Sequence, residues 1–248
     1  MEWRDQDGVR WLEAELPGAR AAFSTRLGGV SEAPFETLNL GILTGDERPA
    51  VLENRARLAA AIGLKPDRVL MGLQVHGSEL LEHSSAQDPC PYAYPGSPLA
   101  EVDGHLTATP GLAPLVLVAD CLPVVLSGSG GVAMLHCGWR GLAAGIVARG
   151  AAAVGAERAA IGPGIGSCCY EVGPEVLERF VELGEGIADG RMLDLAEVAR
   201  RQLRAAGVER IESAEICTSC EPAFFYSHRR DGERSGRQAG LVHLREGG

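Results

Sequence analysis

Two short apolar segments, residues 114–119 and 131–136, restrict most strongly how this chain can fold. Their sequences, PLVLVA and GVAMLH, contain no Asp, Glu, Lys or Arg. Runs of this length and composition are typical of strands at the centre of a sheet that is covered on both faces. A longer apolar stretch, 112–126, includes the first run, but Asp120 and two prolines interrupt it, and it is too short to cross a membrane. The two segments therefore predict buried strands.

Further strands and helices are predicted on both sides of these segments. The strands cover 9–14 and 20–25, which meet at Pro17-Gly18, and 69–75, 159–162, 208–217 and 238–244. The helices cover 49–62, which Asp46 caps, and 139–154, 174–183 and 194–206. Their mixed order predicts an α/β fold with a mixed sheet, and a sandwich of two packed sheets with outer helices is the alternative. The length of 248 residues fits a single domain over 1–248.

The charge of the chain limits the partners that it can bind. Lys and Arg number 23 against 33 Asp and Glu, so the net charge is −10. Without a basic excess to displace counterions, binding to nucleic acid is not expected. Lys65 is the only lysine, so a small basic pocket would be built from arginines, which suit bidentate phosphate contacts. The first residues, MEWRDQDG, lack the apolar stretch of a signal peptide, and we expect a cytoplasmic protein with reduced thiols and no membrane partner.

Three segments place a metal-binding or nucleophilic side chain where an apolar strand gives way to a turn. They are QVHG at 74–77, ADCLP at 119–123 and HCGWRG at 136–141. If the preceding strands lie in one sheet, then His76, Cys121 and His136 converge at one edge, where α/β folds place active sites. Two imidazoles and one thiolate suit zinc and leave a fourth position open, as in catalytic sites.

Each of these three side chains also has a simpler interpretation. A single histidine at a strand end is usually a hydrogen-bonded core residue, and a single cysteine in an apolar strand is usually inert packing. A third interpretation needs no metal: Cys121 is a nucleophile and His136 its base, as in cysteine hydrolases. The spacing in the sequence does not separate a ligand thiolate from a nucleophilic one.

Several arginines are candidates for an anion site. Arg140 begins a predicted helix, where backbone N–H groups and a guanidinium can hold an anion together. Arg26 and the pair Arg229-Arg230 could add to that site, although solvated arginines are the simpler expectation. Arg55 lies inside a predicted helix, where an exposed ion pair is the default.

Four other cysteines are candidates for a second metal site. Cys217 and Cys220 form a CxxC, and Cys168 and Cys169 are adjacent. Four thiols could hold a structural zinc, but adjacent cysteines are difficult to direct at one tetrahedral ion. The thioredoxin pattern needs a helix after CxxC, and Glu221-Pro222 follows instead. Cys137 is expected to point away from His136, because side chains alternate along a strand.

The chain resembles the YfiH/laccase-domain family, also described as purine nucleoside phosphorylase YfiH and as peptidoglycan editing factor. The resemblance covers about residues 20–244 and rests on several segments in the same order. These segments are STRLGGVS (24–31), FETLNLG (35–41), ENR (53–55), QVHG, ADCLP, HCGWRG, IGPGIGSCCYEVG (161–173) and FFYSHRRDGERSGRQAG (224–240).

The resemblance implies a fold, a metal and an activity. The fold is a single-domain α/β layered sandwich with mixed β-sheets and outer helices, and the catalytic zinc is held by His76, Cys121 and His136. The implied activities are phosphorolysis of adenosine, inosine and methylthioadenosine and deamination of adenosine, for which an open zinc position would activate water for attack at C6. The residues for which we predict substrate contacts are Arg26, Asn39, Arg55, Asp120, Arg140 and His228. Asp120, Asp103 and His228 are the candidate proton donors to the departing purine.

Other functions remain as alternatives. The word laccase implies copper oxidation of phenols, but the chain has 6 histidines and no His-x-His pair, so a multicopper site is not expected. Copper binding in vitro is still possible, because copper competes well for such ligands. The alternatives are a peptidoglycan-precursor editing hydrolase at the same His/Cys/His site and a non-enzymatic metal-binding protein. The predicted partners are nucleosides and phosphate, in a monomer or small homo-oligomer.

Overall fold

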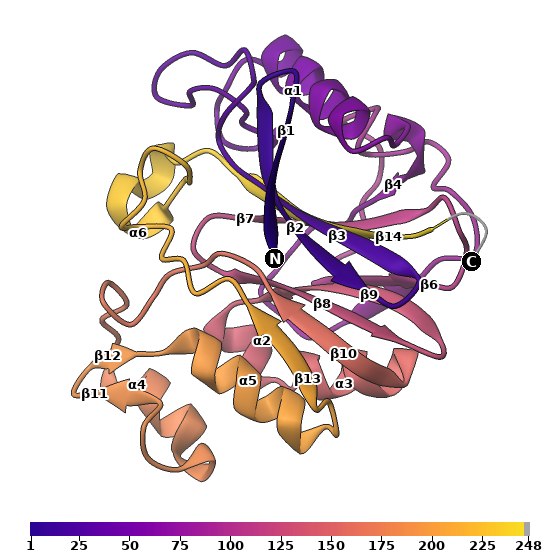
Figure 1. The fold of residues 1–248 in the computed structure, drawn as a ribbon. Coiled ribbons are helices and arrows are strands. Elements are labelled where there is room, and N and C mark those ends of the chain that lie inside the picture. The colour runs from indigo at the N-terminus through magenta and orange to yellow at the C-terminus, as the bar shows by residue number, and fades with distance from the viewer. Residues whose placement is uncertain (246–248) are drawn as a thin grey trace.

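Two six-stranded sheets pack face to face in the computed structural model, which describes residues 1–245 (Figure 1). The first sheet has the strand order β1 (Glu2–Gln6), β2 (Val9–Leu16), β3 (Ala19–Ser24), β14 (Gln238–Leu244), β7 (Ala113–Val118) and β4 (Val69–Leu70). The second has the order β13 (Arg210–Ser213), β10 (Ala156–Ile161), β8 (Leu122–Gly128), β9 (Gly131–Cys137), β6 (Gly104–Thr107) and β5 (Leu80–Glu82). Both sheets contain parallel and antiparallel pairs, and β11 (Ala188–Asp189) pairs with β12 (Met192–Leu193) apart from them.

Helices cover the outer face of each sheet. Helix α1 (Arg48–Ala61) lies over the first sheet, whereas α2 (Trp139–Ala143), α3 (Ile146–Val154) and α5 (Leu195–Ala205) lie against the second (Figure 1). The shorter helices are α4 (Pro174–Leu177), α6 (His228–Asp231), η1 (Pro66–Arg68), η2 (Glu178–Leu183) and η3 (Gly232–Arg234). The layers are therefore helix, sheet, sheet and helix, and no helix within residues 1–245 combines the length and apolar character that a membrane span requires.

The alternation of side chains along β9 divides its residues between two cores. Val132 and Met134 pack between the sheets, whereas Leu135 and Cys137 pack against the helices. Cys137 thus points toward the helices, as the alternation predicted. By the same alternation, His136 shares the face of Val132 and Met134 and points toward the first sheet.

The layered α/β sandwich is confirmed, whereas the expectation of one mixed sheet is wrong. The strand at 114–119 corresponds to β7 in the first sheet, and the strand at 131–136 corresponds to β9 in the second. The chain passes from one sheet to the other in the short connection 119–121, and β8, which follows it and contains Pro123, pairs with β9 in the second sheet. The candidate ligands therefore meet between two sheets and not at one edge of a single sheet.

The predicted strand 69–75 is also shorter than expected, because side chains replace its ladder. Regular pairing with β7 ends at Leu70, and the amide of Gln74 then donates to Leu117 O at 2.7 Å and accepts from Leu117 N at 2.8 Å. The chain is thereby tied to β7 through a side chain, and the backbone N–H groups of residues 75–77 donate to Asp103 instead of a strand.

Three predicted helices differ in detail. Residues 139–154 form two helices, because Gly145 between them has φ +83°. Residues 174–183 form α4 followed by the 3₁₀ turn η2. Glu47, not Asp46, is the N-cap residue of α1, since the Asp46 carboxylate accepts from Ser31 Oγ and Asn39 Nδ2.

Candidate metal centre and cavity

His76, Cys121 and His136 reach one point from three separate elements. His136 lies on β9, Cys121 lies in the short connection between β7 and β8, and His76 follows β4 in a turn where its φ is +61°. Their ligand atoms lie within 4.8 Å of one another, which is close enough to hold one metal ion. One further such group exists within residues 1–245, and it consists of Cys168, Cys169, Cys217 and Cys220.

The buried carboxylate of Asp103, just before β6, holds two of the three side chains in place. Its Oδ1 accepts from the backbone N–H of His76 at 2.9 Å and lies 2.8 Å from Nδ1 of His136. Its Oδ2 accepts from Val75 N at 3.1 Å and Gly77 N at 2.7 Å. A carboxylate only accepts, so Nδ1 of His136 carries the proton and Nε2 is left for a ligand. Asp103 is therefore a positioning residue, because it fixes both the loop of His76 and the ring of His136.

Charges within this group oppose the effect of burial. Burial alone would raise the pKa of Cys121, but the neighbouring His136 and His76 outweigh it and lower that pKa to about 6. Burial would lower the pKa of His136, but Cys121 and Asp103 raise it to about 9. Hydrogen bonds from His136 and the backbone likewise outweigh burial at Asp103 and lower its pKa. Without a metal, the centre at pH 7 is therefore a thiolate beside an imidazolium.

Metal affinity at this centre is expected to rise with pH. Between pH 6 and pH 9 the Cys121 thiolate is already formed, but His136 must release a proton before it can bind a metal. The affinity should therefore increase about tenfold per pH unit in this window and level off above it. Calorimetry of zinc binding in buffers of different ionisation enthalpy should show about one proton released at pH 7.5. The experiment uses a variant with serine at Cys168 and Cys220, so that those thiols do not compete, and an affinity independent of pH would contradict the expectation.

Gly138 is predicted to be necessary for metal binding, because a side chain at this position would press against two of the ligands. A Cβ atom at this position would lie 2.9 Å from Sγ of Cys121 and 3.3 Å from Cδ2 of His76. We expect Gly138→Ala to displace the sulfur and to weaken metal binding by roughly 10-fold or more, as changes beside metal ligands do. Competition with a chromophoric chelator would measure this, and a melting temperature close to that of the wild type would separate it from a folding defect. Unchanged metal affinity would show that the sulfur has room to move.

A cavity of about 520 Å³ opens at this centre. Apolar side chains form one part of its wall and include Met71, Leu73, Leu99 and Leu117. Four arginines also line it within residues 1–245, namely Arg55, Arg140, Arg229 and Arg237, together with the single carboxylate of Asp120. The size is that of a small-molecule site, and the excess of arginine favours an anionic ligand.

Four of the six predicted substrate contacts lie on the wall of this cavity: Arg55, Asp120, Arg140 and His228. Arg26 and Asn39 do not lie on the wall that residues 1–245 form. Arg26 donates to Glu36 O and Pro222 O, and its guanidinium lies 4.6 Å from the ring centre of Tyr226. Asn39 accepts from Gly41 N and Arg237 N, so it supports two residues that do line the cavity.

The expectation of an exposed ion pair at Arg55 is wrong. Its side chain is only 2 % exposed and donates to the carbonyls of Leu40, Pro91 and Tyr92. Its Nη2 atom is buried and has no hydrogen-bond partner among residues 1–245. Burial lowers the pKa of this guanidinium. Arg55 is therefore fixed in the wall of the cavity by the backbone carbonyls to which it donates.

Two residues of the site differ from the sequence-based prediction. Arg237 lines the cavity but is not among the predicted contacts, and its one sequence signal is its place in the segment FFYSHRRDGERSGRQAG. Asp103 is predicted as a proton donor, but its four contacts make it a positioning residue. Both carboxylate oxygens of Asp120 also accept hydrogen bonds, from Thr218 Oγ1 at 2.7 Å and from Arg229 N at 2.6 Å. Like Asp103, Asp120 is therefore held by its neighbours.

The fold and the site together define a two-sheet α/β sandwich protein with a His/Cys/His group in an arginine-lined cavity. The chain belongs to the family described as multi-copper polyphenol oxidoreductase laccase, which matches residues 20–245.

Curated relatives and a solved structure agree with this assignment. The chain is 36% identical to purine nucleoside phosphorylase YlmD of Geobacillus stearothermophilus over 97% of both chains. It is 37% identical to purine nucleoside phosphorylase YfiH of Escherichia coli over 92% of this chain and 94% of the relative. The crystal structure of YlmD from Geobacillus stearothermophilus superposes with a TM-score of 0.90, at 34% identity over 98% of both chains.

Proposed function

We propose that the protein is a zinc-dependent purine nucleoside phosphorylase that also deaminates adenosine. The observation that carries this proposal is the convergence of His76, Cys121 and His136 with four arginines in one cavity. Relatives named purine nucleoside phosphorylase support the same activity. We further propose nucleosides and phosphate as the substrates and the cytoplasm as the location.

The donor set fits zinc, which binds nitrogen and sulfur ligands and keeps an open position in catalytic sites. His76, Cys121 and His136 would hold the ion, and its chemistry there would be that of a Lewis acid that acidifies bound water. Asp103 would hold Nδ1 of His136 and so direct Nε2 toward the metal, which displaces the proton from Nε2 when it binds. Copper would also bind such ligands in vitro.

In phosphorolysis, the other side chains that line the cavity would bind phosphate, contact the purine and supply a proton. Arg140, Arg229 and Arg237, which line the cavity and are less buried than Arg55, would hold the phosphate for attack at the ribose carbon. The apolar wall that includes Leu73 and Leu117 would contact the purine. The departing purine needs a proton. The carboxylate oxygens of Asp103 and Asp120 already accept hydrogen bonds, so His228 is the best placed of the three candidate donors.

Two other functions are less well supported by the site. The low pKa of Cys121 beside His136 is what a cysteine nucleophile needs, so an editing hydrolase remains the second candidate. Oxidation of phenols by several coppers needs more histidine ligands than this centre offers. The other ligand group found within residues 1–245 contains cysteines alone.

Chromatography of adenosine incubated with zinc-replete protein and phosphate tests the proposal. Adenine with ribose 1-phosphate would establish phosphorolysis, and inosine would establish deamination. The matched control is Cys121→Ala protein prepared in the same way. Unchanged adenosine at high enzyme concentration would reject the purine activity, and the same assay with peptidoglycan precursors would then test the hydrolase.

A further inference from the structure

The second group of cysteines lies where two parallel strands end. Strands β10 and β13 run side by side, and the loops that follow them carry Cys168-Cys169 and Cys217–Cys220. These loops are held together by a bridge between Gly164 and Cys217 and by a bond from Thr218 N to Gly164 O at 2.9 Å. The topology thus brings thiols about 50 positions apart in sequence to one place.

The four sulfur atoms lie within 4.8 Å of one another. Sγ of Cys220 is 3.5 Å from Sγ of Cys168 and 3.4 Å from Sγ of Cys169. Zn–S bonds of about 2.3 Å in a tetrahedron place the sulfurs about 3.8 Å apart, whereas a disulfide bond is about 2.05 Å long. The spacing therefore fits a tetrathiolate metal site, and all four cysteines are free.

Adjacent cysteines are expected to be difficult to direct at one tetrahedral ion, but Cys168 and Cys169 both bring their sulfurs into the group. Cys168 and Cys169 lie in a turn and not in a strand, so their side chains do not alternate between two faces. Each of the two comes close to the same sulfur of Cys220. The backbone N–H of Gly166 also donates to Sγ of Cys217 at 3.2 Å, which stabilises negative charge on that sulfur.

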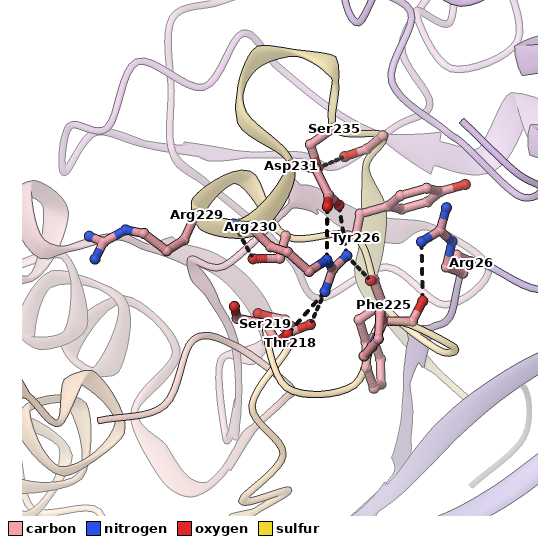
Figure 2. A network of polar contacts seen from close by, with 12 residues as sticks. Arg26, Thr218, Ser219, Phe225, Tyr226, Arg229, Arg230, Asp231 and Ser235 are labelled. Atoms are coloured by element: carbon pink, nitrogen blue, oxygen red, sulfur yellow. Dashed lines mark hydrogen bonds and ion pairs between the residues drawn. The ribbon is translucent and has the colours of Figure 1, made fainter. Parts of the chain in front are cut away.

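Two arginines place positive charge at the loops. Arg229 donates to Cys169 O at 3.2 Å and to Glu171 O at 3.0 Å. Arg230 donates to the carbonyls of Thr218 and Ser219, inside the CxxC turn, while it pairs with Asp231 (Figure 2). Four thiolates and one Zn²⁺ carry a net charge of −2, which the Arg229 guanidinium would partly balance, whereas Arg230 is already paired with Asp231.

We propose that Cys168, Cys169, Cys217 and Cys220 bind a structural zinc ion that joins the loops after β10 and β13. The consequence for the cavity follows from two contacts. Thr218, inside the CxxC turn, donates to Oδ1 of Asp120, and the backbone N–H of Arg229 donates to Oδ2 of Asp120. Asp120 has φ +89° and directly precedes Cys121, so the site holds a strained part of the cavity wall. The proposal does not depend on the nucleoside chemistry.

Metal counting by native mass spectrometry and elemental analysis of zinc-loaded, reduced protein tests the proposal. The wild type should hold two zinc ions per chain. Cys168→Ser with Cys220→Ser should hold one, and so should His76→Ala with His136→Ala. Cys90→Ser is the matched control, since that buried cysteine lies outside both groups, and it should keep two ions.

Two measurements on the wild type test the proposal even if a cysteine variant fails to fold. Cys168 and Cys220 are exposed, so they should react rapidly with a thiol reagent in metal-free protein and become protected on zinc addition. Replacing zinc by Co²⁺ should produce a thiolate charge-transfer absorption several-fold stronger than a site with one cysteine gives. One zinc per chain together with unprotected thiols would overturn the proposal. The proposal would also be overturned if the protein, purified under reducing conditions, held no metal at these cysteines and its mass showed that they form disulfide bonds.

Discussion

Cys121→Ala, His76→Ala and His136→Ala are each expected to abolish turnover and to remove one metal ion from the protein. The three ligand atoms lie within 4.8 Å of one another, so the loss of any one leaves two ligands, which bind zinc weakly. Loss of the ion would reduce kcat/KM at least about 10²–10³-fold, the effect of removing one preorganised electrostatic group. Steady-state rates with adenosine and phosphate, together with zinc content, measure both effects.

The same series separates a metal ligand from a nucleophile. If Cys121→Ala keeps its zinc and still loses all turnover, Cys121 is a nucleophile and the metal mechanism is wrong. Cys137→Ala is the control, because Cys137 lies next to His136 but packs against the helices on the opposite face of β9. It should retain both the metal and the activity. Zinc counted in the background of Cys168→Ser with Cys220→Ser reports this centre alone.

The sequence was informative where local chemistry determines structure. The apolar runs at 114–119 and 131–136 became β7 and β9, and Pro17-Gly18 became the turn between β2 and β3. His76, Cys121 and His136 were grouped because each follows an apolar segment at a turn, and the structure brings them together. The spatial reason differs from the one predicted, since the ligands come from two sheets and their connection.

The remaining features depend on contacts between distant residues. The sequence does not predict strand β8, because Pro123 interrupts the strand pattern, yet the ladder with β9 accommodates this proline opposite His136. The burial of Arg55 depends on the carbonyls of residues 91 and 92, far from α1 in sequence. The second cysteine group depends on the parallel pairing of β10 with β13, which no local pattern reveals. Local sequence rules therefore identify the reactive residues better than the strands and distant hydrogen-bond partners that hold them in place.

Asp103→Asn is expected to weaken both the fold and the metal centre. Each carboxylate oxygen accepts from two donors, and an amide nitrogen cannot accept. Whichever way the amide turns, two donors that are partly or fully buried lose their acceptor, at a cost of about 1–3 kcal/mol each. The melting temperature should fall by about 5 °C or more, at about 2–4 °C per kcal/mol for a chain of this size. Metal affinity should fall roughly 10–100-fold, as when other partners of metal-binding histidines are changed.

A readout beyond stability distinguishes positioning from general destabilisation. The Asp103 carboxylate raises the pKa of His136, so in metal-free Asp103→Asn protein that pKa should fall from about 9 toward the ordinary value of a histidine. The pH window in which zinc binding releases a proton should shift down with it, which NMR titration of the imidazole and calorimetry can follow. Asp67→Asn, an exposed change of the same kind in η1, should alter neither the pKa of His136 nor the metal affinity. A destabilised Asp103→Asn protein with an unshifted His136 would show that Asp103 supports the loop of His76 alone.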